Sequence, residues 1–147
     1  SALHSGTVGA ALTAANNGAH GIAVSLDVTD RPMEWPTAVY LVPEVIERLG
    51  KIGRGRRVVN LNAPNISLSE LAGVEITDLA KWGDAAGNLR PQGDGSWLFE
   101  RQLGDPKRRI TGTDNAAVRE GSISVSELVG IRTQKSDLHL GDLSVAK

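Results

Sequence analysis

The sequence predicts an α/β fold, because helical and strand-like patterns alternate in its first half. Residues 5–17 form a helical pattern of small residues, and a short apolar run follows at residues 22–26. A second helical pattern at residues 36–49 is again followed by an apolar run, at residues 58–61. Helices that alternate with short apolar strands are typical of a parallel sheet covered by helices.

The composition fits a soluble globular domain and excludes several kinds of function. The 147 residues, 40% of them hydrophobic and 22% charged, suffice for one domain with its own core. The formal net charge of −1 argues against binding to a nucleic-acid duplex, and the lack of cysteine excludes disulfides and thiolate metal sites. Since there is neither an apolar run of about 20 residues nor a signal-peptide pattern, we expect a cytoplasmic protein without a membrane span.

The first helix has clear start and stop signals. Ser5 is a good N-cap residue, and Gly18 suits the C′ position that ends a helix. Val8, Leu12 and Ala15 recur at helical spacing along one face. Because a helix of small residues lies on a sheet and a β-α-β unit begins with a strand, we expect a further strand upstream of this chain.

The start of this helix, Ser5-Gly6-Thr7, is the candidate binding site. The unpaired N–H groups of a helix N-terminus and its positive dipole end attract anions, phosphate among them. Gly6 has no side chain to block an approaching anion, and Thr7 adds a hydroxyl donor. The same residues also fit an ordinary capped helix, and the pattern by itself favours that simpler interpretation.

The second helix, from Pro36 to Leu49, contains an irregularity. Pro36 suits its first turn, and apolar residues recur at three- and four-residue spacing. Pro43 interrupts the pattern without an evident reason, and we expect it to kink the helix. The basic connector from Gly50 to Arg57 links a helix to a strand, opposite the ligand edge of an α/β sheet, so we favour a solvated connector over a phosphate clamp.

The chain divides into an α/β core at residues 1–81 and a region at residues 82–147 that we expect to support oligomerisation. Asp94-Gly95 predicts a hairpin whose arms carry Leu89 and Trp97-Leu98-Phe99. A lone hairpin is marginal in water, so these apolar residues need a partner on the body or on another subunit.

Shorter elements are predicted on either side of the hairpin. We expect a helical turn at Ser69–Leu71 and a strand at Val74–Leu79, with Val74 and Ile76 on one side. After the hairpin, we expect a short helix capped by Thr113 or Asp114 and ended by Gly121, then an exposed or edge-type strand at Ser122–Leu128 and a tail.

Other polar residues are weaker candidates. None of the histidines is spaced as a helical metal pair, and His4 is the best candidate for a general base among His4, His20 and His139 because it adjoins the phosphate turn. Asn60 and Asn62 point to one face of a strand, where we favour hydrogen bonds to neighbouring loops over catalysis. For Asp27 and Asp30, in the loop after the first strand, we favour turn capping over a role in the site.

Four motifs resemble the SurE (survival protein E) nucleotidase family. They follow the family's order and are Ser5-Gly6-Thr7-Val8-Gly9-Ala10-Ala11, Gly21-Ile22-Ala23-Val24-Ser25-Leu26-Asp27, Asn60-Leu61-Asn62-Ala63-Pro64, and Gly112-Thr113-Asp114-Asn115-Ala116-Ala117-Val118 with the strand after it. In that strand the chain departs from the family pattern, because Ser122 and Glu127 stand where the family has tyrosine and proline.

The resemblance implies a Rossmann-like three-layer fold of the SurE type, of which this chain is the C-terminal portion, with a protruding hairpin and a C-terminal extension. It implies hydrolysis of nucleoside 5′- or 3′-monophosphates with a divalent cation, Mg²⁺ or Mn²⁺, by a homodimer or tetramer. In that scheme Ser5, Gly6 and Thr7 hold the phosphate, and the acidic metal ligands fall upstream of Ser1. We therefore expect residues 1–147 alone to be inactive.

Two other functions remain open at this point. A non-catalytic remnant would keep the hairpin and tail for oligomerisation and lose the chemistry. A generic α/β nucleotide-binding module would use the same helix start without hydrolysis. An upstream strand that ends in paired aspartates would distinguish the enzyme from both.

Overall fold

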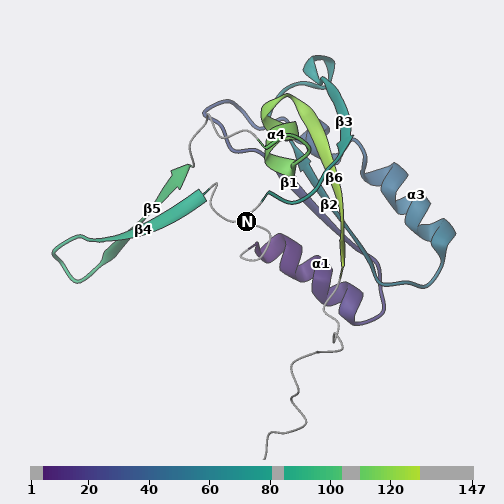
Figure 1. The fold of residues 1–147 in the computed structure, drawn as a ribbon, viewed down its shortest axis with the longest axis horizontal. Coiled ribbons are helices and arrows are strands. Elements are labelled where there is room, and N and C mark those ends of the chain that lie inside the picture. Colours follow the sequence, from purple (N-terminus) through teal and green to yellow (C-terminus); the bar gives the residue numbers. More distant parts are fainter. Residues whose placement is uncertain (1–4, 81–84, 104–109, 130–147) are drawn as a thin grey trace, which may run out of the picture.

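The computed structural model describes residues 5–80, 85–103 and 110–129, which form an α/β core and a separate hairpin (Figure 1). A four-stranded sheet carries the core, and a two-stranded sheet forms the hairpin. In chain order the elements are α1 (Gly6–Asn16), β1 (Gly21–Leu26), α2 (Trp35–Val39), α3 (Val42–Ile52), β2 (Arg57–Ala63), the 3-10 helix η2 (Leu68–Glu70), β3 (Gly73–Ile76), β4 (Ala85–Pro91), β5 (Trp97–Leu103), α4 (Asp114–Arg119) and β6 (Ser122–Val129).

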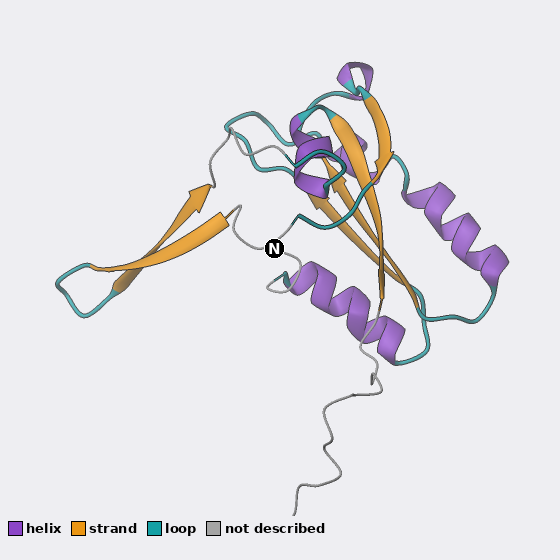
Figure 2. Ribbon diagram, viewed as in Figure 1, coloured by secondary structure: helices purple, strands orange, loops and turns teal. Residues whose placement is uncertain are grey.

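The core sheet is mixed, with strand order β1-β2-β6-β3 (Figure 2). β1 and β2 run parallel, β6 runs antiparallel to β2, and β3 runs parallel to β6. The expected α/β architecture is confirmed, because helices cover the sheet on both faces. The core residues on the two faces come from opposite sides of the same strands, as the two-residue period of a strand requires.

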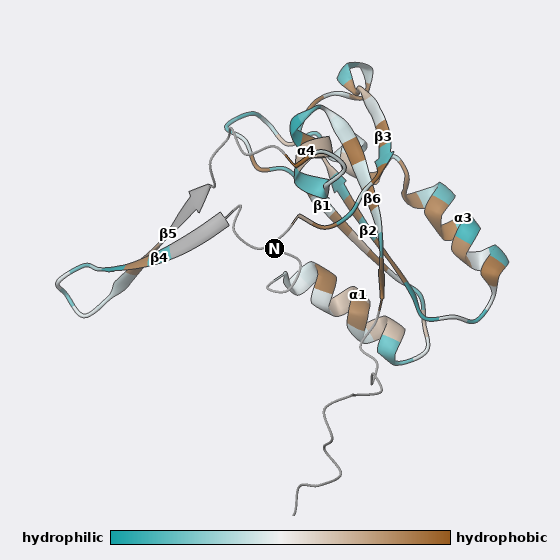
Figure 3. Cartoon of the chain, viewed as in Figure 1, coloured by the Kyte–Doolittle hydropathy of each residue, from teal (hydrophilic) through white to brown (hydrophobic). Residues whose placement is uncertain are grey.

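One face of the sheet is covered by α1, and the opposite face by α2. Val8, Ala11 and Ala15 of α1 pack against Ala23 and Val58. On the other face Ala38, Ala63 and Ile123 form a second cluster, with Val24, Leu26, Leu41 and Leu71 packed around it. The strands on which α1 packs, β1 and β2, carry much brown, and so hydrophobic, ribbon in Figure 3.

The ends of α1 follow the predicted signals. The Ser5 hydroxyl accepts a hydrogen bond from the Val8 N–H at 3.2 Å. Gly18 has φ +88°, and the N–H groups of Gly18 and Ala19 donate to the carbonyls of Ala15 and Ala14, which is the Schellman pattern of a helix end. The helix therefore begins and ends where residue chemistry alone places it.

The second predicted helix is wrong as one continuous element, because the structure breaks it into α2 and α3. Pro43 lies in the first turn of α3, where the missing N–H has no helix partner to lose. Pro36 occupies the equivalent place in α2. Pro43 thus starts a helix instead of kinking one. The apolar residues that recur at three- and four-residue spacing do not form one buried face, because two of them, Val39 and Ile46, are more than half exposed.

The prediction of an exposed or edge-type strand at Ser122–Leu128 is also wrong. β6 lies between β2 and β3, and Ser122, Ser124 and Ser126 are buried. The Ser124 and Ser126 hydroxyls bond to the Thr77 hydroxyl, at 2.7 Å and 3.0 Å. Alternating serines resemble a solvated face in a sequence, but here the Ser124 and Ser126 hydroxyls each bond to a third hydroxyl and therefore tolerate burial.

The shorter elements form where they are predicted, although the strand expected at Val74–Leu79 is β3, which ends at Ile76. The turn expected at Ser69–Leu71 is η2, which has a capping box between Ser67 and Glu70. Thr113 is the N-cap of α4, with its hydroxyl accepting from the Ala116 N–H. Val74 and Ile76 share one side of β3, and that side is exposed.

The predicted hairpin is confirmed as β4 and β5, and it projects away from the core sheet (Figure 1). Leu89 lies opposite Phe99 in its register. At its tip, the backbone N–H and the hydroxyl of Ser96 donate to the Asp94 carboxylate at 2.8 Å and 2.6 Å, and these bonds lower the pKa of Asp94 from its usual value. The predicted C-terminal tail falls outside the described residues.

Candidate functional site

The start of α1 presents unpaired backbone donors. Ser5 uses its hydroxyl to cap Val8 and its carbonyl to accept from the Gly9 N–H at 2.8 Å. Gly6 and Thr7 are exposed, and among the described residues no acceptor bonds to their N–H groups or to the Thr7 hydroxyl. The predicted phosphate turn therefore has the donors that an anion requires.

Gly6 has no packing reason to be glycine within the described structure. A Cβ atom built on Gly6 meets no heavy atom within 4 Å, and the same holds for Gly9 one turn later on the exposed side of α1. Neither residue has a positive φ. The open space around Gly6 leaves the helix start accessible to a ligand.

This helix start lies toward the carboxyl ends of β1 and β2. A Cβ on Gly21, at the beginning of β1, would lie 2.3 Å from the Ala11 carbonyl oxygen, so the middle of α1 crosses the first residue of β1. From that contact α1 runs back about 9 Å to Ser5, whereas β1 advances about 16 Å to Leu26. Ligands of open α/β sheets bind beyond this carboxyl edge.

The loops that follow β1 and β2 are joined at this edge by Asn65, which sequence reasoning missed. Asn65 is buried and bonds to Glu34, Thr29 and Pro32 of the preceding loop. Its position directly after Pro64, which ends the strand, was the available signal. A polar residue there lies at the ligand edge, as Asp27 does after β1.

Asn60 and Asn62 share the α1 face of β2, but the expected bonds to loops are not found for Asn60. Asn60 is 2% exposed, and its Oδ1 atom bonds to no partner in the described part of the chain. Ser126 lies directly opposite it on β6. Asn62 lies nearer the carboxyl edge and is half-buried. The loop-binding asparagine is Asn65, not either of the two predicted ones.

His20 is a structural residue. Its Nδ1 atom accepts from the Arg57 N–H at 3.3 Å, and its Nε2 atom bonds to the Gly53 carbonyl at 2.7 Å, as the donor because a carbonyl oxygen can only accept. The contact fastens the basic connector to the end of α1, away from the ligand edge. His4 and His139 fall outside the described residues.

The acidic residues near the site do not form a metal centre. Asp27 accepts from its neighbour, the Val28 N–H, at 3.0 Å, which fits the capping interpretation. Within residues 5–80, 85–103 and 110–129, no group of three or more His, Cys, Asp or Glu side chains could hold a metal ion.

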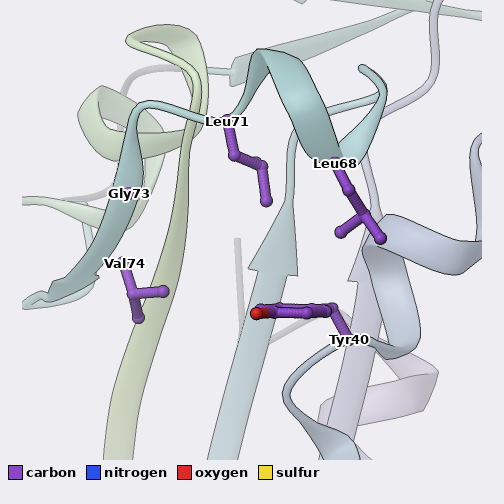
Figure 4. Close-up of a pocket in the computed structure, with 5 residues that line it drawn as sticks. All are labelled: Tyr40, Leu68, Leu71, Gly73 and Val74. Carbon is purple, nitrogen blue, oxygen red and sulfur yellow. The ribbon is translucent and has the colours of Figure 1, made fainter.

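A shallow apolar groove lies on the α2 face of the sheet (Figure 4). Its volume is about 290 Å³, and it is lined by Tyr40, Leu68, Leu71, Gly73 and Val74. In the view of Figure 4 the Tyr40 ring lies below Leu68 and Leu71. The groove contains no charged side chain and lies on the face opposite α1, so it is not part of the phosphate turn.

Comparison with known proteins decides the family. The sequence model of the family described as Survival protein SurE matches residues 1–85. The chain belongs to the SurE family. A solved relative, the SurE protein from Aquifex aeolicus, has the same fold with a TM-score of 0.66 at 22% identity, over 86% of this chain and 52% of that chain.

Curated SurE relatives are similar over nearly the whole of this chain. The protein named 5′-nucleotidase SurE in Pseudomonas putida is 34% identical over 136 residues, which are 89% of this chain and 53% of the relative. The protein of the same name in Paramagnetospirillum magneticum is 34% identical over 141 residues, covering 92% and 54%. The chain thus spans about half the length of relatives that are named as nucleotidases. Among the residues that the structure describes, every helix is too short or too polar to span a lipid bilayer.

Proposed function

We propose that this chain is the phosphate-binding half of a nucleotidase that hydrolyses nucleoside 5′- or 3′-monophosphates. The observation that carries the proposal is the start of α1, where Gly6 and Thr7 offer unpaired donors in open space at the carboxyl edge of the sheet. A phosphate placed there would accept from these N–H groups and from the Thr7 hydroxyl. It would also lie at the positive end of the α1 dipole.

Fixed donors at this position can also assist the reaction. Negative charge develops on the phosphoryl oxygens and on the leaving oxygen during transfer, and preorganised N–H groups stabilise such charge without reorganisation. Ser5 serves the site indirectly, because its bond to Val8 fixes the first turn and so the direction of the two free N–H groups.

The divalent cation that we propose for the reaction, Mg²⁺ or Mn²⁺, does not fit the residues described here. Both ions prefer several carboxylate or other oxygen ligands, and these residues form no such cluster. The metal ligands are proposed to come from an acidic segment outside this chain, and residues 1–147 alone are expected to be inactive. The absence of cysteine is compatible with a reducing cytoplasm, which we propose as its compartment.

Replacing Gly6 by alanine in the native protein tests the phosphate turn. The new methyl group meets no protein atom, so the melting temperature should stay the same or rise slightly. It would project into the space of the bound phosphate, and inhibition by inorganic phosphate should weaken at least tenfold. Thr7→Ala should weaken the free energy of phosphate binding by about 1–3 kcal/mol, the contribution of a hydrogen bond to a charged group.

Gly9→Ala is the matched control, because Gly9 lies on the exposed face of the same helix with equally open space. It should stabilise the protein by about 0.5–1 kcal/mol and leave phosphate inhibition unchanged. If Gly6→Ala behaves in the same way as Gly9→Ala, the helix start is only a cap and the proposal is wrong.

A further inference from the structure

One buried side chain fastens the loop after β1 to the loop after β2. Asn65 is 3% exposed. Its Oδ1 atom accepts from the Glu34 N–H at 2.8 Å, and its Nδ2 atom donates to the Thr29 hydroxyl at 2.7 Å and to the Pro32 carbonyl at 3.2 Å. One amide therefore holds the middle and the end of the segment 27–34, which we call the β1 loop.

The beginning of the β1 loop is held by the sheet itself. The Asp27 N–H donates to the Ala63 carbonyl at 2.9 Å, which extends the β1–β2 ladder by one bond. The loop is thus fixed from the inside at both ends, while its outer residues, among them Val28 at 82% exposure and Arg31, face solvent. A shape held this firmly is suited to contact a ligand.

The β1 loop lies where the nucleoside of a nucleotide would extend from a phosphate bound at the start of α1. Ser5 lies about 7 Å short of the end of β1, by the helix and strand rises given above. The β1 loop begins beyond that end. A phosphate held at Ser5-Gly6-Thr7 would leave the attached nucleoside to extend toward the loops at the carboxyl edge.

We infer that Asn65 is a positioning residue of the substrate site, which holds the β1 loop as a wall for the nucleoside of a bound nucleotide. The inference rests on the proposed function and deepens it. The phosphate is held by α1. Loss of this wall therefore weakens binding of the nucleoside but leaves binding and hydrolysis of the phosphate group unchanged. Its signature is a change in KM for nucleotides alone.

The test compares two substrates in the native protein and its Asn65→Ala variant. The substitution removes all three bonds to the β1 loop. KM for a nucleoside monophosphate should rise about tenfold with little change in kcat. Both constants for glycerol phosphate, a phosphomonoester without a nucleoside, should stay within twofold. Thr29→Val removes only one of these bonds, at an exposed residue, and should raise the nucleotide KM by less than Asn65→Ala does. This variant serves as the test if Asn65→Ala does not fold.

Thr37→Val is the matched structural control. Thr37 is fully buried and donates to the Ile66 carbonyl at 2.7 Å, so the variant loses a buried bond near the same loops but keeps every bond of Asn65. It should lower the melting temperature without changing KM for either substrate.

Three results would overturn the inference. These are equal changes for both substrates, a lower melting temperature with unchanged KM values, or a nucleotide KM in Thr37→Val that rises as much as in Asn65→Ala. If the wild-type protein hydrolyses neither substrate, the proposed function fails. Calorimetric binding of a nucleoside monophosphate then decides the inference separately, and equal affinity of wild type and Asn65→Ala overturns it.

Discussion

At the scale of single residues, the contact between His20 and Gly55 shows how one ring constrains a backbone. A Cβ on Gly55 would lie 2.6 Å from His20 Cε1, although Gly55 has no positive φ. The ring cannot turn aside freely, because both of its nitrogen atoms bond to the connector, at Gly53 and Arg57. Gly55 is therefore required by a side chain and not by its own backbone conformation.

This predicts a non-additive pair of substitutions. Gly55→Ala should destabilise the protein by about 1–2 kcal/mol, because the methyl group displaces the ring and its two hydrogen bonds. In a His20→Ala background the same substitution should cost almost nothing, because the space is vacant. Urea denaturation of the wild type, both single variants and the double variant measures the coupling. Additive effects would contradict the assignment of Gly55 to this contact.

At the scale of elements, the seating of α1 on β1 depends on Gly21. The hypothetical Cβ of Gly21 would lie 2.3 Å from the Ala11 oxygen and 2.8 Å from its carbonyl carbon. These are backbone atoms, which cannot rotate away as a side chain does. The helix can lie this close to the strand only because the strand begins with glycine.

Gly21→Ala should therefore push α1 away from the sheet. It should lower the free energy of unfolding by about 1–3 kcal/mol, the usual range for overpacking. Because α1 carries the phosphate turn, phosphate inhibition should weaken as well. The contrast is with Gly9→Ala, which stabilises the same helix from its exposed face. A fully stable Gly21→Ala protein with normal phosphate inhibition would mean that the helix and strand are less closely packed than described.

At the scale of the whole molecule, the hairpin is the strongest indication of assembly. Leu89, Trp97 and Phe99 are each more than 60% exposed, and Leu98 on the other side of β5 is 43% exposed. The hairpin is thus apolar on both faces, and neither face is covered within the described chain. Aromatic residues in such patches are common anchors of protein interfaces.

We predict a homodimer or tetramer in which the hairpin reaches between subunits. Deletion of Leu89 to Glu100 from the native protein should lower its mass by light scattering toward that of a monomer. Its circular dichroism should stay largely native, because the hairpin belongs to a separate sheet from the core. An unchanged mass after the deletion would show that the hairpin is a surface feature without a role in assembly.

Local chemistry in the sequence was sufficient for much of the fold and for the first part of the site. The Ser5 cap, the Gly18 end of α1, the Asp94-Gly95 turn and the Thr113 cap each depend on residues within a few positions, so they were predicted correctly. The free donors at Gly6 and Thr7 follow from the same local rules. Their role in binding phosphate stays a prediction.

Only the tertiary structure decided the features that depend on distant partners. Ser124 and Ser126 of β6 tolerate burial because Thr77 satisfies their hydroxyls across 47 and 49 residues of sequence. Asn65 closes the β1 loop through partners 31 to 36 residues away. Gly55 is needed because of His20, from which β1, α2 and α3 separate it in the sequence. Hydrogen bonds and close contacts of this kind follow no fixed spacing in the sequence, since they form only when the folded sheet brings distant segments of the chain side by side.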